Sequence, residues 1–128
     1  ACAEGFKVFI SGMAMGFDIY CAEAVLALRE QYGVKLHCAV PFEGQERDYT
    51  DAYKARYRRI IEDADKVVTL EKDYSPACYR KRNEFMVDSS SRLICFCRGS
   101  AGGTFNTVKY AQRQNITVIN LYDELRDY

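Results

Sequence analysis

The chain has 128 residues, of which 48% are hydrophobic and 28% charged, and its 18 Lys and Arg balance its 18 Asp and Glu. This composition is typical of a single globular domain over residues 1–128 and excludes a disordered chain. We expect no membrane span and no signal peptide, because no apolar run approaches the roughly 20 residues of a spanning helix and the first five residues lack a basic region. Zero net charge makes a nucleic acid an unlikely main partner, since that affinity comes chiefly from clustered cations.

The six cysteines favour neither a disulfide framework nor a zinc site. There is no C-x-x-C pair, and the single histidine, His37, lies beside Cys38 in an apolar run. Most cysteines occupy such runs, for example residues 93–97, where a thiol behaves as a small hydrophobe. We therefore expect reduced core cysteines in a cytoplasmic protein, with no metal and no cofactor.

Strand-like runs alternate with helical stretches in the first half of the chain. Residues 7–11 and 35–40 predict strands, and Pro41 is expected to end the second one. Residues 18–32 between them predict a helix that Gly33 ends. The apolar stripe expected to bury this helix consists of Cys21, Val25, Leu28 and Tyr32.

The alternation continues to the C-terminus. A loop at 42–49 is expected to precede a helix at about 50–64 and a strand at 66–70. The predicted buried face of that helix comprises Tyr53, Tyr57, Ile60, Ile61 and Ala64. Ser75 as N-cap and Pro76 after it predict the start of a helix that runs to about residue 89. The remaining elements are expected to be a strand at 92–97, a loop at 99–103, a helix at 104–114 and a strand at 117–121.

Strands that alternate with helices of this length predict right-handed crossovers and a mostly parallel sheet. The expected fold class is therefore α/β, with a Rossmann-like three-layer α/β/α architecture. Ligands of such sheets bind at the carboxyl ends of the strands, so the loops that follow the strands are the places to look for a site.

Two of these loops carry glycines ahead of a helix. Residues 11–18 (SGMAMGFD) and 99–104 (GSAGGT) offer close backbone approach and helix-start N–H groups, which attract phosphate. Neither has the spacing of a dinucleotide fingerprint or a Walker loop. The alternative is that both are tight or flexible turns, with Asp18 as a helix cap in the first.

Two further segments offer polar groups. Arg82 precedes Met86 by one helical turn, with Asn83 beside it. Arginine is suited to bidentate binding of phosphate. The usual alternative for such a run of charges is a solvated basic face. In residues 41–46 (PFEGQE), Glu43 and Gln45 could bind ribose hydroxyls or a base edge, or be ordinary loop residues. The sequence shows no paired geometry for a catalytic acid and base.

These segments together resemble the YpsA-like family of the SLOG superfamily, which is related to DNA-processing protein A and the Lonely Guy phosphoribohydrolases. The resemblance runs from about Phe9 to Leu121 and is carried by SGMAMGFD, PFEGQ, RNEFMVD and GGTFNTVKYA. It implies a bacterial protein with a site for a nucleotide or nucleotide-derived small ligand. The implied site residues are Ser11, Gly12, Met13, Gly16, Asp18, Pro41, Glu43, Gln45, Arg82, Asn83, Met86, Gly102, Gly103, Thr104 and Thr107.

The chain departs from the pattern of the family at two points. The family resembled here begins with an earlier strand carrying Thr-Gly-His-Arg-Pro, which is expected to be missing from an N-terminally short domain. Either the sequence is a fragment, or the gap in the sheet is filled otherwise, for example by a partner chain. Because an open sheet position exposes unpaired backbone groups, we expect self-association. In the Lonely Guy branch an acid follows the glycine loop by three residues, whereas this chain has Thr107 three residues beyond Thr104. Without that acid, hydrolysis of an N-glycosidic bond is a minority hypothesis.

Three functional hypotheses remain from the sequence. The preferred one is a binding or sensing module for a nucleotide-like ligand, without turnover. The second is a nucleotide-processing enzyme in which Arg82 grips phosphate and Glu84 or Glu43 is the acid. The third is single-stranded DNA binding, which the neutral charge disfavours.

Overall fold

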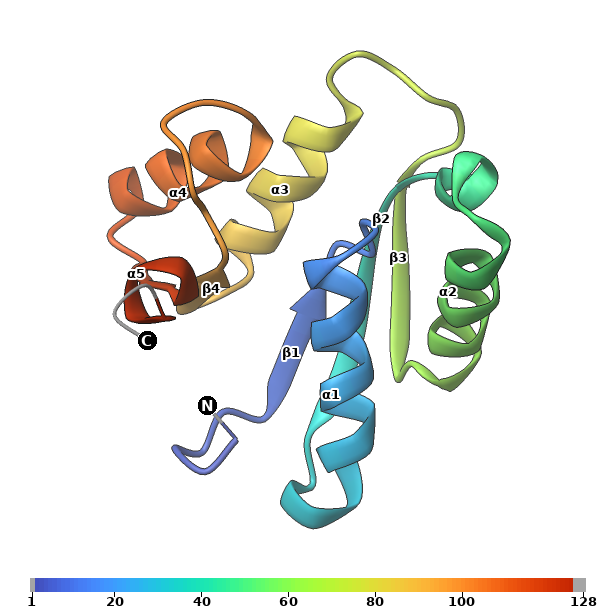
Figure 1. Cartoon of the computed structure of the whole chain (residues 1–128), viewed down its shortest axis with the longest axis horizontal. Coiled ribbons are helices and arrows are strands. Elements are labelled where there is room, and N and C mark those ends of the chain that lie inside the picture. Colours follow the sequence, from blue (N-terminus) through green and yellow to red (C-terminus); the bar gives the residue numbers. More distant parts are fainter. Residues whose placement is uncertain (1, 126–128) are drawn as a thin grey trace. The chain divides into compact units, whose positions relative to one another are not determined.

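The structure, a computed structural model, describes residues 2–125. The chain folds as two compact units, Ala1–Cys78 (unit 1) and Tyr79–Tyr128 (unit 2). Helices and strands alternate along the chain, and every strand pair is parallel (Figure 1). The predicted α/β, Rossmann-like class is confirmed. Within residues 2–125, no helix has the length and apolar character needed to span a bilayer.

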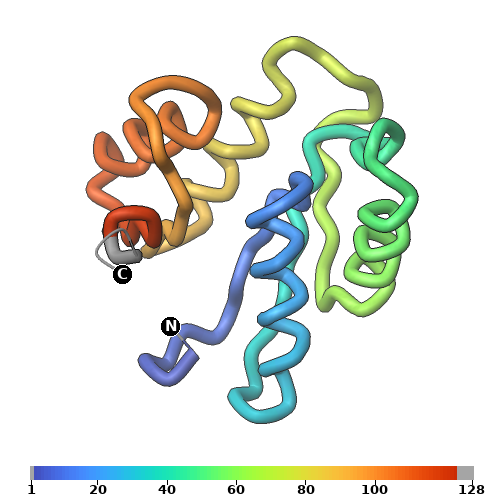
Figure 2. The backbone as a smooth tube through the Cα atoms, viewed as in Figure 1, coloured from blue at the N-terminus to red at the C-terminus, as the bar shows by residue number. Residues whose placement is uncertain are grey.

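Unit 1 contains a three-stranded parallel sheet in the order β1-β2-β3. Its elements are β1 (Val8–Ser11), α1 (Phe17–Tyr32), β2 (Lys35–Phe42), the short 3-10 helix η1 (Gln45–Asp48), α2 (Asp51–Asp63) and β3 (Lys66–Glu71). The backbone trace in Figure 2 follows the two crossovers, from β1 through α1 to β2 and from β2 through α2 to β3. Because such crossovers are right-handed, α1 and α2 cover the same face of the sheet.

The core of unit 1 lies between the sheet and these two helices. It consists of Met13, Ile19, Ala22, Val25, Val34, Leu36, Cys38, Tyr57 and Ile60. The buried face predicted for α2 is confirmed, because Tyr57 and Ile60 are core residues and the other three predicted residues pack against them.

The stripe predicted for α1 is wrong in part. Ile19 and Ala22 are fully buried, whereas Leu28 is 37% exposed and Cys21 is half-buried. The middle of α1 reads CAEAVLAL, with apolar residues on nearly every side. The period alone therefore does not determine which side faces the sheet.

Two predicted boundaries in unit 1 are also wrong. β2 passes through Pro41 and ends at Phe42. Since β1 pairs with β2 only as far as Cys38, Pro41 has a strand on one side alone, and its missing N–H is tolerated. The third helix begins at Cys78, and Ser75 does not cap it, because the Ser75 hydroxyl donates to Glu71 Oε2 at 2.6 Å.

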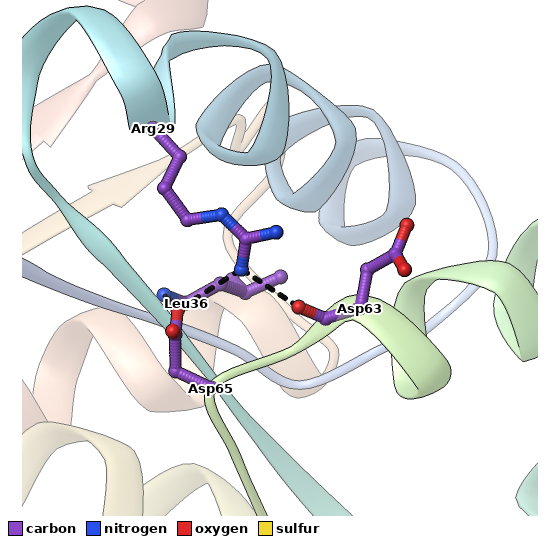
Figure 3. Close-up of polar contacts among 4 residues, drawn as sticks. All are labelled: Arg29, Leu36, Asp63 and Asp65. Carbon is purple, nitrogen blue, oxygen red and sulfur yellow. Dashed lines mark hydrogen bonds and ion pairs between the residues drawn. The ribbon is translucent and has the colours of Figure 1, made fainter.

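A polar cluster joins α1 to β2 and to the turn before β3 (Figure 3). Arg29 Nη1 donates to the carbonyl oxygen of Asp63 at 2.7 Å and lies 3.3 Å from Asp65 Oδ2, which also accepts from the Leu36 N–H at 2.9 Å. The Leu36 N–H and the Arg29 guanidinium hold the pKa of Asp65 below its ordinary value. The cluster lies at the amino end of β3, away from the loops that follow the strands, and its role is structural.

Unit 2 contains a two-stranded parallel sheet. Its elements are most of α3 (Cys78–Asp88), β4 (Arg92–Cys95), α4 (Gly103–Arg113), β5 (Thr117–Asn120) and α5 (Leu121–Leu125). The short helix α5 is not among the predicted elements. β4 ends at Cys95, two residues earlier than predicted, because the Asn120 side chain takes over the pairing. Its Oδ1 accepts from the Cys97 N–H and its Nδ2 donates to the Cys97 carbonyl, both at 3.0 Å.

Three of the cysteines are core residues, as the apolar runs around them predict. Cys38, Cys78 and Cys95 are buried core residues. Burial raises the pKa of the Cys38 thiol to about 12 and that of Cys95 to about 11. It also raises the pKa of the half-buried Cys21 to about 11, with the Asp18 charge adding to the effect. These thiols stay protonated at neutral pH and are poor nucleophiles.

Candidate ligand-binding site

The loop between β1 and α1 is shaped by polar side chains at its two ends. Ser11 Oγ accepts from the Met13 N–H at 3.2 Å and donates to the Asp18 carbonyl at 3.0 Å. Asp18 Oδ2 accepts from the Ala14 N–H at 3.2 Å. Met13 has a φ of 64° and a fully buried side chain. Ser11, Met13 and Asp18 therefore set the shape of the loop.

Gln45 and Tyr49 hold the same loop from the segment after β2. Gln45 Nε2 donates to the Gly12 carbonyl at 3.0 Å, and Gln45 Oε1 accepts from the Tyr57 hydroxyl at 3.1 Å. The Tyr49 hydroxyl donates to the Met13 carbonyl at 2.8 Å. With both carbonyls engaged and Gln45 only 5% exposed, the loop conformation is fixed by the protein itself.

The backbone amides at the start of α1 point to an anion site. Gly16 precedes the helix with φ 89° and ψ −122°, a conformation that favours glycine, and no side chain caps the helix there. In the part of the chain that the structure describes, the N–H groups of Met15, Gly16 and Phe17 donate to no protein acceptor. Three consecutive donors at the positive end of a 16-residue helix form an arrangement suited to an anion.

Arg47 adds a positive charge beside Gly44, the residue before Gln45, and is not among the residues predicted from the sequence. A Cβ on Gly44, which has a φ of 86°, would lie 3.0 Å from Arg47 Nη2, so the guanidinium lies against this glycine. Among residues 2–125 no carboxylate forms an ion pair with the exposed Arg47. Glu43 is also exposed, whereas Pro41 is buried. The available signal was the G-x-x-R spacing that starts at Gly44.

Unit 2 contains a second glycine loop of the same kind, ahead of α4. Gly102 has a φ of 96° and precedes the helix without a side-chain cap. Within residues 2–125, the N–H groups of Gly103, Thr104 and Phe105 donate to no protein acceptor. The Thr107 hydroxyl donates to the Gly103 carbonyl at 2.8 Å, so it serves the first turn of the helix.

The predicted residues on α3 form a local hydrogen-bonded pair. Arg82 Nε donates to Asn83 Oδ1 at 2.7 Å, and Arg82 is only 6% exposed. Its guanidinium lies 5.7 Å from the centre of the Tyr79 ring. Met86 is half-buried, and its carbonyl accepts from the Ser90 hydroxyl at 2.6 Å.

The carboxylates of α3 also have partners. Glu84 Oε2 lies 3.3 Å from Arg80 Nη1. The Tyr110 hydroxyl donates to Asp88 Oδ1 at 2.7 Å, which raises the pKa of Tyr110 above its ordinary value. Among the residues that the structure describes, no group of three or more His, Cys, Asp and Glu side chains is arranged to hold a metal ion.

Five of the predicted site residues lie together in one hydrogen-bonded group of unit 1: Ser11, Gly12, Met13, Asp18 and Gln45. In unit 2 the structure joins Arg82 to Asn83 and Gly103 to Thr107. Contact of these residues with a ligand stays a prediction.

These features define an α/β protein of the Rossmann-like class, with glycine loops ahead of two of its helices. The sequence matches the YspA SLOG family over residues 1–123, and the chain belongs to this family, as the resemblance predicts. The uncharacterized SPbeta prophage-derived protein YoqJ of Bacillus subtilis (strain 168) is 30% identical over 118 residues, which cover 82% of this chain and 69% of that protein.

Two UPF0398 proteins are also similar. One from Oceanobacillus iheyensis is 35% identical over 94 residues, covering 71% of this chain and 50% of that protein. YpsA of Bacillus subtilis (strain 168) is 32% identical over 95 residues, covering 71% of this chain and 52% of that protein. The chain therefore spans about half the length of these UPF0398 relatives.

Proposed function

We propose that the protein binds a nucleotide or a nucleotide-derived small ligand, with an anionic group of the ligand at the start of α1. The observation that carries the proposal is the row of three backbone N–H donors from Met15 to Phe17. A phosphate accepts several hydrogen bonds at once, and its charge is stabilised by the helix start. Membership of the SLOG family supports a nucleotide-related function.

The rigidity of the loop supports the proposal further. Two of its carbonyls are held by Gln45 and Tyr49, and two of its amides by Ser11 and Asp18. The remaining amides thus have their direction set before a ligand arrives. Binding then requires little additional ordering of the backbone, which favours affinity.

Arg47 is the cation that we assign to this site. Its guanidinium lies against Gly44, and the neighbouring Gln45 touches the Gly12 carbonyl. A charge-assisted hydrogen bond from Arg47 to phosphate would add to the neutral bonds of the amides. Glu43 is retained from the sequence prediction as an acceptor for ribose hydroxyls.

The proposal extends to the residues predicted in unit 2. The N–H groups from Gly103 to Phe105 repeat the arrangement at the start of α1, which supports a second anion contact at Gly102, Gly103 and Thr104. Arg82, Asn83, Met86 and Thr107 are proposed as ligand contacts within unit 2 on the strength of the sequence pattern.

We propose binding without turnover, in the cytoplasm. Thr107 stands where the resembled hydrolases carry an acid, and its hydroxyl is committed to the Gly103 carbonyl. Glu84 and Asp88 on α3 are engaged by Arg80 and Tyr110. The buried thiols, with raised pKa values, suit a reducing compartment.

The test is a thermal-shift screen with AMP, ADP, ADP-ribose, ribose 5-phosphate and inorganic phosphate, followed by mass spectrometry of each ligand that stabilises the protein. We expect stabilisation by nucleotides that are recovered intact. Released base would instead show a hydrolase, and the lack of a shift with every nucleotide would contradict the proposal.

A matched pair of glycine variants locates the binding. A Cβ at Gly103 or at Gly99 meets nothing within 4 Å, so Gly103→Val and Gly99→Val should both fold. Gly103 supplies an amide at the start of α4, whereas Gly99 does not. We expect Gly103→Val to weaken nucleotide binding and Gly99→Val to leave it unchanged. Gly12→Val in the other loop should also weaken binding.

A further inference from the structure

The helix α1 has a second, largely apolar face, opposite the residues that it buries in the core of unit 1. Residues of this face recur every three or four positions and form one stripe along the helix: Tyr20, Ala24, Ala27 and Gln31, with Leu28 beside it. All five are exposed, Tyr20 by 59% and Leu28 by 37%. A helix that is apolar on nearly every side is typical of one that packs on both faces. The stripe therefore indicates a docking surface.

The amino-terminal end of the stripe carries a positive charge. The Arg56 guanidinium, from α2, lies 4.7 Å from the centre of the Tyr20 ring, and its Nε donates to Glu23 Oε2 at 3.0 Å. The hydrogen bonds from Arg56 hold the pKa of Glu23 below its ordinary value, and the charge of Arg59 adds to the effect. Because Arg56 and Glu23 neutralise each other, the exposed Arg59 leaves this end positive.

The carboxyl-terminal end of the stripe carries a negative charge, that of Glu30. This residue follows Glu23 by seven positions, so it lies about two turns farther along on the same side of α1. Glu30 is exposed, and within residues 2–125 neither Glu30 nor Arg59 takes part in an ion pair. Each end of the stripe therefore offers a charge opposite to that of the other end.

We infer that this stripe binds the same stripe of a second copy of the chain, with the two α1 helices antiparallel. A surface whose two ends have opposite charges is complementary to itself under a two-fold rotation. An axis midway between Ala24 and Ala27 sets Ala24 of one copy opposite Ala27 of the other, and such small side chains allow the helix axes to approach to roughly 8 Å. The same axis brings Glu30 of the second copy to the end of the stripe where Arg59 lies.

This surface is separate from the open edge of β1, and the inference is independent of the proposed function. In an antiparallel pair the positive start of each α1 helix lies beside the negative end of the other, which adds to the attraction. Leu28 of one copy then covers Ala24 of the other. The contact buries apolar surface on both copies and sets the opposite charges at its margin.

The test is sedimentation velocity of Val8→Lys, in which pairing through the edge of β1 is opposed, with and without Ala24→Arg. We expect Val8→Lys to form dimers, and Ala24→Arg to raise their dissociation constant at least about tenfold, because it places a charge at the centre of an apolar contact. Asp73→Arg is the matched control: Asp73 is exposed in the loop after β3, outside the stripe, and the dissociation constant should not change. A Val8→Lys protein that is monomeric up to its highest soluble concentration would overturn the inference, as would dimers that Ala24→Arg leaves intact.

An exchange of charges tests the antiparallel arrangement in the same Val8→Lys background. Glu30→Arg and Arg59→Glu each place like charges against one another across the contact, and each should weaken the dimer at least about threefold. The double variant restores opposite charges and should recover the original dissociation constant. Far-ultraviolet circular dichroism checks that every variant is folded. A double variant that dimerises no more tightly than the single variants would overturn the inference, because the two charges would then not meet.

Discussion

The side-chain amide of Gln45 donates to the carbonyl oxygen of Gly12 at 3.0 Å, which joins two segments 33 residues apart in the sequence. The same side chain accepts from the Tyr57 hydroxyl at 3.1 Å, so α2 supports the loop through one buried amide. Gln45 was predicted as a ligand contact, but both ends of its amide are engaged by the protein. It acts in the proposed site as a positioning residue.

Tyr57→Phe tests this support. The substitution leaves the buried Gln45 Oε1 without its donor, which should lower the free energy of unfolding by about 1 to 3 kcal/mol. Tyr32→Phe is the matched control, because Tyr32 also packs against the core while its hydroxyl has no hydrogen-bond partner in residues 2–125. Urea denaturation should show a loss for Tyr57→Phe alone. Equal losses in the two variants would contradict the account.

The Asp65 cluster predicts a loss of stability in acid. The pKa of Asp65 is lowered in the folded state, so its charged form contributes stability in full above the unfolded-state pKa of about 3.9. This contribution disappears as the pH falls through the lowered folded pKa. Asp65→Asn keeps an acceptor for the Leu36 N–H and removes the charge. Its unfolding free energy should be below that of the wild type at pH 7, with the difference shrinking as the pH falls.

Asp63→Asn is the control for this experiment. Arg29 binds the backbone carbonyl of Asp63, so that contact survives the change of side chain (Figure 3). The pH dependence of urea unfolding for Asp63→Asn should follow that of the wild type. An Asp65→Asn difference that stays constant from pH 7 into acid would show that the Asp65 charge does not contribute.

The two glycines at the helix starts should respond oppositely to alanine. Gly16 has a φ of 89°, and an alanine there is strained, at a cost of about 1 to 3 kcal/mol. Gly103 has an ordinary φ and open space around its Cβ position, so Gly103→Ala should gain about 0.5 kcal/mol. Thermal unfolding of the two variants checks this. A stabilised Gly16→Ala would show that the loop conformation differs from the one described.

Self-association through β1 is a further expectation. In the part of the chain that the structure describes, β1 pairs with β2 alone, and Val8 is 47% exposed. An unprotected strand edge favours pairing with another strand, and a lysine placed on it opposes such pairing. Light scattering should show dimers or larger species for the wild type and fewer for Val8→Lys. A monodisperse monomer across the measured concentrations would contradict the expectation.

Local patterns were sufficient to predict much of the fold. The period of apolar residues identified the buried face of α2, and each strand of the structure overlaps a predicted one. Where a predicted helix start or strand end is wrong, one side-chain contact explains the difference. Ser75 has the residue type of a helix cap, but Glu71 four residues earlier takes its hydroxyl. β4 ends early because Asn120, which is distant in sequence, binds the backbone of Cys97.

The candidate site was predicted in outline, without the division of roles among its residues. Glycines ahead of helices are visible in the sequence, and so the loops before α1 and α4 were found. The engagement of Gln45 by Gly12 and Tyr57 depends on tertiary packing over 33 and 12 residues, which no local pattern reveals. Arg47 was missed for a similar reason, since its importance follows from its position against Gly44.

The most direct test of the central claim is a titration of the isotope-labelled protein with AMP, followed through backbone amide signals in two-dimensional NMR spectra. The account predicts saturating shifts of the amide signals of Met15, Gly16 and Phe17, because these three N–H groups would donate to the phosphate. If AMP binds and these three signals do not move, or if no signal moves at saturating AMP, the start of α1 is not the anion site and the central claim is wrong.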